Sequence, residues 1–154
     1  VWLNEAFPEA KLLPDAPGEF ERQRQLADLV YFSSTVHPSV TRYAMPFRFV
    51  KDQSIAMTEV RPAGLEVLSE VFGQINERLK EGPWWYGEQW SIIDAYLLWA
   101  WTRSTIVGFP QDGFPNLIRH HKLSLDRPAV QHALRRQAED IEKLKQEGIY
   151  KAPA

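Results

Sequence analysis

Cysteine is absent from the 154 residues of this sequence. Disulfide bonds, thiolate catalysis and cysteine-ligated metal are therefore excluded from within these residues, and we expect a protein of a reducing compartment, the cytoplasm. An excess of charge of one sign is also missing, because the formal net charge is −2. This balance gives no general electrostatic reason to expect nucleic acid or an anionic membrane as a partner.

Long apolar runs are missing as well. The longest fall far short of the ~20 residues that a helix needs to span a bilayer, and no segment has the pattern of a signal peptide. The alternation of apolar and polar residues that is typical of strands is almost absent. Because 44% of the residues are hydrophobic, the chain can bury a substantial core, and we predict one globular domain of the all-α class.

Helical periodicity runs through most of the chain. Apolar positions at spacings of three and four predict a long amphipathic helix from Phe20 to about Val40, with a bend at Pro38. Further helices are predicted at about residues 56–80, 91–107, 114–125 and 128–147. The helix at 91–107 is apolar on nearly every side, so we expect it to be buried among the others.

This apolar helix contains one carboxylate near its start, in the stretch "WSIIDAYLLWAW". An ionised carboxylate in an apolar interior needs a fixed partner, and Ser91 stands three residues before Asp94. Ser-x-x-Asp is the pattern of a capping box, in which each side chain binds a backbone N–H of the first turn. We therefore predict that Asp94 is a folding element. A role as catalytic acid or metal ligand is less favoured, since no second carboxylate, histidine or cysteine lies at ligand spacing.

No metal site is predicted elsewhere in the sequence. His120 and His121 are adjacent, so they point to different sides of a helix and cannot form a metal-binding pair one helical turn apart. The tryptophans are assigned to packing, because aromatic residues in a helical domain more often belong to the core than to a pocket. These tryptophans are Trp84, Trp85, Trp90, Trp99 and Trp101.

Several motifs, taken in order, resemble the second half of bacterial glutathione transferases, most closely the beta-like group. They are "LNEAFPEAKLLP", "TVHP", "WWYGEQWSIIDAYLLWAW", "GFPNLIRHH" and "LDRPAVQHAL". The resemblance implies a helical bundle of the glutathione transferase C-terminal type, and a family capping box at Ser91 and Asp94. It also implies that residues 1–13 are the end of a thioredoxin-like domain and its linker, followed by the helical domain at 14–154.

In the family, the thioredoxin-like domain binds glutathione and carries the catalytic residue. The resemblance therefore implies that this chain binds no cofactor and is inactive alone. The complete parent would be a homodimer that adds the thiolate of glutathione, its co-substrate, to a small hydrophobic electrophile. The alternative is a non-catalytic helical module for protein assembly, as also found in this family. "TVHP" favours the enzyme.

Candidate site residues follow from the same resemblance. His37 matches a histidine that faces the glutathione sulfur, where a group that titrates near neutrality suits proton transfer or anion stabilisation; it could equally be a helix histidine without such a task. Ser34 and Thr35 match residues that approach glutathione across the domain boundary. The expected electrophile pocket consists of Thr41, Tyr43, Phe47 and Arg103.

Overall fold

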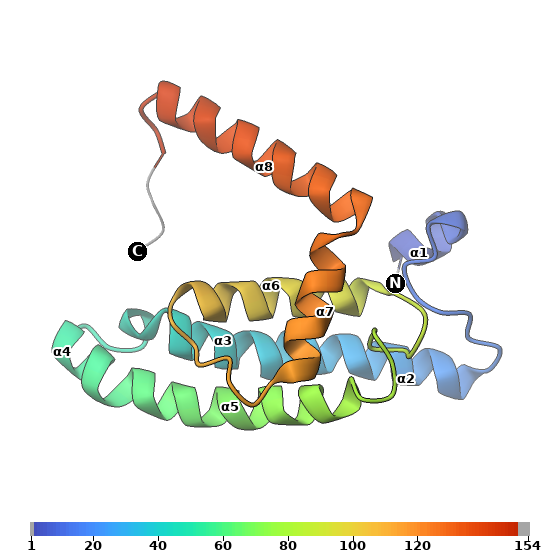
Figure 1. Cartoon of the computed structure of the whole chain (residues 1–154), viewed down its shortest axis with the longest axis horizontal. Coiled ribbons are helices and arrows are strands. Elements are labelled where there is room, and N and C mark those ends of the chain that lie inside the picture. The colour runs from blue at the N-terminus through green and yellow to red at the C-terminus, as the bar shows by residue number, and fades with distance from the viewer. Residues whose placement is uncertain (1, 151–154) are drawn as a thin grey trace.

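The computed structural model describes residues 2–150, and within this range the chain forms helices joined by short loops (Figure 1). The all-α prediction is confirmed, since β-structure in these residues is limited to two isolated bridges within 84–89. The helical elements are α1 (Trp2–Ala6), η1 (Pro8–Ala10), α2 (Glu19–Tyr31), η2 (Phe32–Val36), α3 (His37–Ala44), η3 (Pro46–Arg48), α4 (Gln53–Ile55), η4 (Ala56–Val60), α5 (Arg61–Arg78), α6 (Ile92–Ile106), α7 (Pro115–Leu125) and α8 (Pro128–Gln146).

Three long segments lie side by side as the body of the bundle (Figure 1). α2, η2 and α3 form one continuous helix, α4, η4 and α5 form a second, and α6 is the third. The predicted helices at 91–107, 114–125 and 128–147 agree with α6, α7 and α8 to within one residue at each end. The helix predicted from residue 56 begins earlier, because the Asp52 carboxylate accepts the N–H groups of Ser54 and Ile55 and caps it at 2.8 and 3.1 Å.

Each of the two continuous helices contains one wide turn just before a proline. The N–H of His37 donates to the carbonyl of Phe32, five residues back, and the N–H of Arg61 donates to Ala56 in the same way. Pro38 and Pro62 each follow the donor residue by one position. A proline has no N–H to donate, and its ring clashes with the carbonyl four residues earlier. The wide turn gives that carbonyl room. The bend predicted at Pro38 is therefore a local widening of the helix.

The core lies where α3, α5 and α6 meet. Phe72 of α5 packs edge-on against Trp101 of α6, with ring centroids 5.2 Å apart, and both rings contact Phe109. Gly64 allows the close approach of α3 and α5, since a Cβ there would lie 3.0 Å from the backbone nitrogen of Tyr43. α6 is buried on the side that faces this core. Its opposite side remains open to solvent, in contrast to the helix buried on all sides that the sequence predicts.

The predicted capping box is present at the start of α6. The Ser91 hydroxyl accepts the N–H of Ile93, and the Asp94 carboxylate accepts the N–H of Ser91 at 2.7 Å. The structure adds two partners that the sequence did not indicate. The N–H of Trp85 donates to Asp94 Oδ1 at 2.8 Å, and His120 Nε2 lies 3.0 Å from the same oxygen. Asp94 thus joins the loop before α6, the first turn of α6 and the middle of α7.

A second buried polar side chain fixes the start of α7. Asn76 of α5 accepts the N–H groups of Asn116 and Leu117 at 2.9 and 3.3 Å, and the Asn116 amide donates to the Asn76 carbonyl at 3.0 Å. Further along α7, His121 Nε2 lies 3.0 Å from the Thr102 hydroxyl of α6. α7 is therefore attached to both α5 and α6 by hydrogen bonds.

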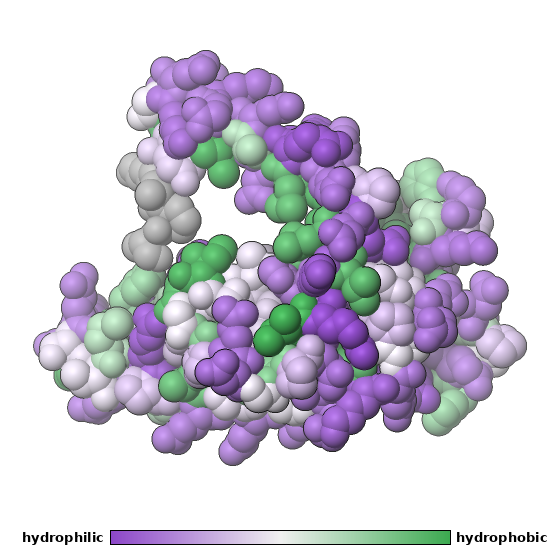
Figure 2. All heavy atoms as spheres, in the orientation of Figure 1, coloured by the Kyte–Doolittle hydropathy of each residue, from purple (hydrophilic) through white to green (hydrophobic). Residues whose placement is uncertain are grey.

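α8 extends away from the bundle (Figure 1), and no residue in it is buried. Leu134 and Leu144 are 45% and 38% exposed. Figure 2 shows polar side chains over the outer side of α8 and hydrophobic ones on the side that faces the bundle. The helix is thus amphipathic, with an apolar side that the described residues leave uncovered.

The network at Asp94 predicts a large effect of its removal on stability. Asp94→Ala should lower the free energy of unfolding by roughly 3 kcal/mol, because it leaves Trp85 N–H, Ser91 N–H and His120 without their shared acceptor. Asp94→Asn retains one acceptor oxygen and should lose less. Urea denaturation measures both variants. An Asp94→Ala protein within about 0.5 kcal/mol of the wild type would contradict the structural role.

The contact between α6 and α7 predicts a pH dependence of stability. Burial, and then the neighbouring His120, lower the pKa of His121 from its usual 6.5. Below that pH the unfolded chain binds a proton at this site more readily than the folded chain, so folding loses stability as the pH falls. The difference in unfolding free energy between wild type and His121→Gln should therefore shrink from about pH 7.5 to about pH 5.5. His132→Gln, in the exposed part of α8, should show no such trend.

Candidate functional site

His37 lies at the first position of α3, directly after the wide turn η2. Its Nδ1 lies 2.8 Å from the hydroxyl oxygen of Tyr96 in α6, although the two residues are 59 positions apart. Its ring stacks on Trp99, with centroids 4.4 Å apart and planes inclined by 25°. The exposed histidine is thus held by two aromatic residues from another helix.

Neither of these aromatic partners was identified as a site residue from the sequence. The sequence predicts a packing role for Trp99, and the structure corrects this, because the Trp99 side chain remains 38% exposed and contacts the candidate histidine. Tyr96 and Trp99 are three residues apart on α6, so they lie on the same side of that helix. The sequence does not reveal the roles of Tyr96 and Trp99, because α6 is apolar on nearly every side. Its periodicity therefore does not show which side faces the core.

The contacts of His37 that the structure describes are with uncharged groups. Burial raises the pKa of the Tyr96 hydroxyl above its usual value of 10.0, so the phenol is protonated at neutral pH. The Thr41 hydroxyl donates to the backbone carbonyl of His37 at 3.0 Å. None of the ion pairs formed by residues 2–150 involves His37.

Ser34 and Thr35 lie in η2, in the turn that precedes His37. The Ser34 hydroxyl donates to the carbonyl of Val30 at 2.7 Å, and its side chain is exposed. Thr35 is half-buried, and its carbonyl accepts the Ser39 hydroxyl at 2.8 Å. Ser34 therefore keeps an oxygen open to solvent close to the histidine, whereas Thr35 is more enclosed.

The side of α6 that carries Tyr96 and Trp99 continues toward its C-terminal end. Arg103 follows Trp99 by one helical turn and is half-buried, while Ile106 is 72% exposed. In Figure 2 hydrophobic side chains gather on the upper edge of the bundle near this end of α6. We call the surface formed by His37, Thr41, Tyr96, Trp99, Arg103 and Ile106 the α3/α6 face. Two of the four residues expected in an electrophile pocket, Thr41 and Arg103, each follow a member of this surface by one helical turn.

The other two expected pocket residues lie elsewhere. Tyr43 is only 3% exposed, packs edge-on against Phe109, and accepts a hydrogen bond from Arg61 Nη2 at 3.3 Å. The Arg61 guanidinium also lies over the Tyr43 ring, 4.7 Å from its centroid, and donates to the carbonyl of Val107. Tyr43 is therefore part of the core, and its spacing of three from Val40 extends the apolar stripe already visible in the sequence.

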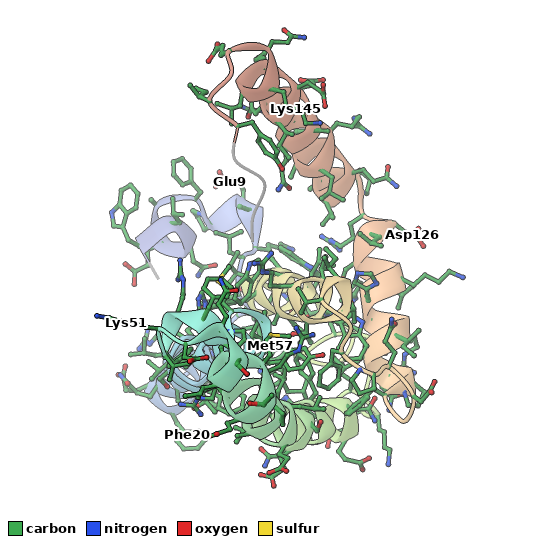
Figure 3. All side chains as sticks on the ribbon, turned by 90° about the vertical axis from the view of Figure 1, so that its left-hand side faces the viewer. Glu9, Phe20, Lys51, Met57, Asp126 and Lys145 are labelled. Atoms are coloured by element: carbon green, nitrogen blue, oxygen red, sulfur yellow. The ribbon has the colours of Figure 1, made fainter. Side chains whose placement is uncertain are left out.

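Phe47 lines a separate apolar cavity of about 300 Å3 beyond the end of α3. Pro46, Met57 and Arg61 form other parts of its wall. Figure 3 shows Met57 on the end of the bundle that is nearest the viewer in that orientation. The cavity suits a small apolar molecule, since its lining is largely hydrophobic and Phe47 and Met57 are 41% and 52% exposed.

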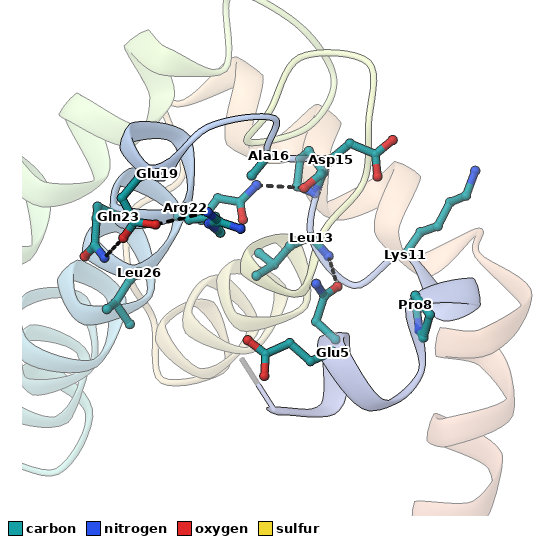
Figure 4. Close-up of a pocket in the computed structure, with 13 residues that line it drawn as sticks. Glu5, Pro8, Lys11, Leu13, Asp15, Ala16, Glu19, Arg22, Gln23 and Leu26 are labelled. Carbon is teal, nitrogen blue, oxygen red and sulfur yellow. Dashed lines mark hydrogen bonds and ion pairs between the residues drawn. The ribbon is translucent and has the colours of Figure 1, made fainter.

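A larger and more polar hollow lies between the N-terminal segment and α2 (Figure 4). The backbone of Leu13 donates to the Asn4 side chain at 3.0 Å, and Gln25 donates to the carbonyl of Pro14 at 2.8 Å. Its charged groups include the exposed pair Glu19 and Arg22, 3.1 Å apart. None of the residues expected to act in catalysis or binding lies in this hollow.

Histidines and acidic residues do not assemble into a metal centre within residues 2–150, where no cluster of three potential ligands is found. His120 is bound to Asp94, whereas His121 contacts Thr102. The two histidines thus point to different partners, as their adjacency predicts. In the same residues, none of the helices has the length and apolar character required to cross a membrane.

Comparison with known proteins identifies the class of this fold. Residues 58–123 match the family model described as the glutathione S-transferase C-terminal domain. The chain is similar to a structure of a ternary complex of BphK, a bacterial glutathione transferase, at 28% identity and a TM-score of 0.73, covering 89% of this chain and 64% of that one. The fold is therefore that of the helical C-terminal domain of these proteins.

Two curated relatives agree. Glutathione S-transferase omega-1 of Sus scrofa is 35% identical over 103 residues, which cover 65% of this chain and 37% of the relative. Glutathione S-transferase GstA of Escherichia coli O157:H7 is 24% identical over 133 residues, 86% of this chain and 62% of the relative. The chain thus spans between about one third and two thirds of these relatives. Residues 58–123 thus match the C-terminal domain of the glutathione S-transferase family.

The different positions of Tyr43 and Phe47 predict different effects of their removal. Tyr43→Ala should lower the free energy of unfolding by roughly 3 kcal/mol, because it empties a packed core position. Phe47→Ala should cost less than about 1 kcal/mol but weaken the binding of an apolar fluorescent dye. Thermal unfolding and dye titration measure the two effects. A reversed order, with Phe47 the more important for stability, would contradict this placement.

Proposed function

We propose that this chain is the electrophile-binding domain of a glutathione S-transferase that adds the thiolate of glutathione to small hydrophobic electrophiles. The observation that carries the proposal is the cluster of His37, Tyr96 and Trp99 on the open α3/α6 face. It combines a polar ring nitrogen with exposed aromatic surface. A thiol and an apolar electrophile require both kinds of group side by side.

The glutathione site and the residue that activates the thiol belong, in this proposal, to a thioredoxin-like domain that precedes the helical domain. Residues 1–13 are then its end and the linker, and residues 14–154 the helical domain. The α3/α6 face offers this partner an apolar contact surface, since Trp99 and Ile106 are exposed. The uncovered apolar side of α8 offers a second one (Figure 2). Exposed apolar surfaces of this kind mark sites of contact with other proteins.

In this arrangement the helical domain contributes groups to a reaction that the other domain initiates. His37 acts as an auxiliary group near the sulfur of glutathione, and Ser34 and Thr35 approach the tripeptide from the preceding turn. The electrophile rests on Thr41, Trp99 and Arg103, with Trp99 as the rigid apolar surface. We propose that Tyr43 supports this site from the core through its contact with Arg61. Phe47 belongs to the adjoining cavity.

The chain alone is then inactive, because it lacks both the glutathione site and the activating residue. We propose that the complete protein is a cytoplasmic homodimer that acts in detoxification. The exposed apolar side of α8 also suits a non-catalytic module that assembles with other proteins, which is the alternative function. The two functions differ in whether the complete protein turns over glutathione.

Two proteins test the proposal: this chain, and the same chain joined to the domain encoded before it. The chain alone should neither bind glutathione nor conjugate it to an activated halobenzene, whereas the complete protein should do both. In the complete protein, His37→Ala should lower turnover by roughly 100-fold, as is typical for loss of one acid–base or electrostatic group. Spectrophotometric conjugation rates provide the measurement.

His132→Ala is the matched control, because His132 lies exposed on α8, away from the α3/α6 face. It should leave turnover unchanged. Conjugation by the chain alone would refute the assignment of the glutathione site to another domain. A complete protein without any conjugating activity, or a gene without a thioredoxin-like domain, would favour the assembly module.

A further inference from the structure

The contacts of His37 leave only one of its ring nitrogens available to a ligand. Nδ1 is 2.8 Å from the Tyr96 hydroxyl oxygen, so that nitrogen is already in a hydrogen bond. Trp99 covers one face of the ring at a centroid distance of 4.4 Å. Since His37 as a whole is exposed, Nε2 is the atom that a molecule on the α3/α6 face would meet.

The direction of the hydrogen bond decides what Nε2 can do. A phenol can donate or accept, and a neutral imidazole has one donor and one acceptor nitrogen. If Nδ1 carried the proton and donated to Tyr96, the phenol proton would need another acceptor. Among the hydrogen bonds of residues 2–150, Tyr96 Oη has His37 as its partner and no other protein acceptor. The bond is therefore satisfied best when Tyr96 donates to Nδ1.

The Tyr96 hydroxyl has a proton to donate at neutral pH. Loss of water around the hydroxyl disfavours the phenolate, and the hydroxyl proton is retained at neutral pH. With Nδ1 as the acceptor, the proton of the neutral imidazole is on Nε2. A ring nitrogen that already holds a proton cannot remove one from a thiol, but it can donate a hydrogen bond to a thiolate.

We propose that Tyr96 is a positioning residue that holds His37 in the Nε2–H form, so that His37 presents a hydrogen-bond donor to the sulfur anion of the thiol substrate. The role at sulfur rests on the proposed function, whereas the form of the imidazole does not. Trp99 contributes by fixing the plane of the ring, which directs Nε2–H. His37 thus stabilises the negative charge of the thiolate. The proton of the thiol is accepted by another group, the activating residue of the thioredoxin-like domain.

Nitrogen-15 NMR of the chain tests the form of the imidazole directly. Correlation of ring protons with ring nitrogens at about pH 8, where histidine is neutral, distinguishes a protonated from an unprotonated ring nitrogen. The signals that are missing from the spectrum of the His37→Gln variant are those of His37. We expect Nε2 to be protonated and Nδ1 to be an unprotonated acceptor, and exposed His132 provides the reference for a histidine without a fixed partner.

Tyr96→Phe removes the donor and keeps the ring. In this variant the His37 nitrogens should shift toward the mixture of forms seen for His132. Tyr86→Phe is the matched control, because the Tyr86 hydroxyl donates to Asp28 at 2.8 Å, at a different place on the bundle. It should leave the His37 signals unchanged. Protonated Nδ1 in the wild type, or unchanged His37 signals in a folded Tyr96→Phe protein, would overturn the proposal.

Kinetics of the complete protein test the role at sulfur separately. Tyr96→Phe should lower kcat roughly tenfold with little change in KM for glutathione, since the contact matters most when the thiolate is present. Tyr86→Phe should have wild-type kcat. If the NMR result holds but the complete protein lacks transferase activity, the assigned form of His37 stands and the proposed function fails. If kcat of Tyr96→Phe is unchanged, the role at sulfur is refuted.

Discussion

The buried carboxylate of Asp94 is the constraint on which the arrangement of the helices depends. It is fully inaccessible to solvent, yet it accepts hydrogen bonds from the loop before α6 and from Ser91, and its Oδ1 contacts His120 of α7. A buried carboxylate is stable only when such partners are all in place. The three segments that supply them are therefore held in one relative position, and α6 begins directly after Ser91.

This fixed start of α6 also determines the candidate site. Tyr96 and Trp99 lie two and five residues after Asp94, so the orientation of the first turns of α6 decides where both aromatic side chains point. The wide turn before Pro38 places His37 opposite them. Two local motifs, a capping box and a widened helical turn, set the positions of two neighbouring helices. They thereby bring together the side chains of His37, Tyr96 and Trp99.

The features that could be predicted from the sequence are those set by short-range patterns. Periodicity predicts the helices, and Ser-x-x-Asp predicts the capping box, because its two residues are three positions apart. The contact between Asp94 and His120 spans 26 positions, and the sequence alone does not show that α7 crosses α6 at this point. The same reason explains why Tyr96 and Trp99 were missed as partners of His37. Tyr43 is different, since its spacing of three from Val40 continues the apolar stripe of this helix, whereas only the resemblance placed it in a pocket.

The proposed position of His37 beside the glutathione sulfur can be measured in a structure of the complete protein with bound glutathione. We expect His37 Nε2 to lie within hydrogen-bonding distance of the sulfur, while Nδ1 keeps its contact with Tyr96 and the ring remains stacked on Trp99. A sulfur bound away from the α3/α6 face, or an imidazole turned so that Nδ1 faces the sulfur, would contradict it.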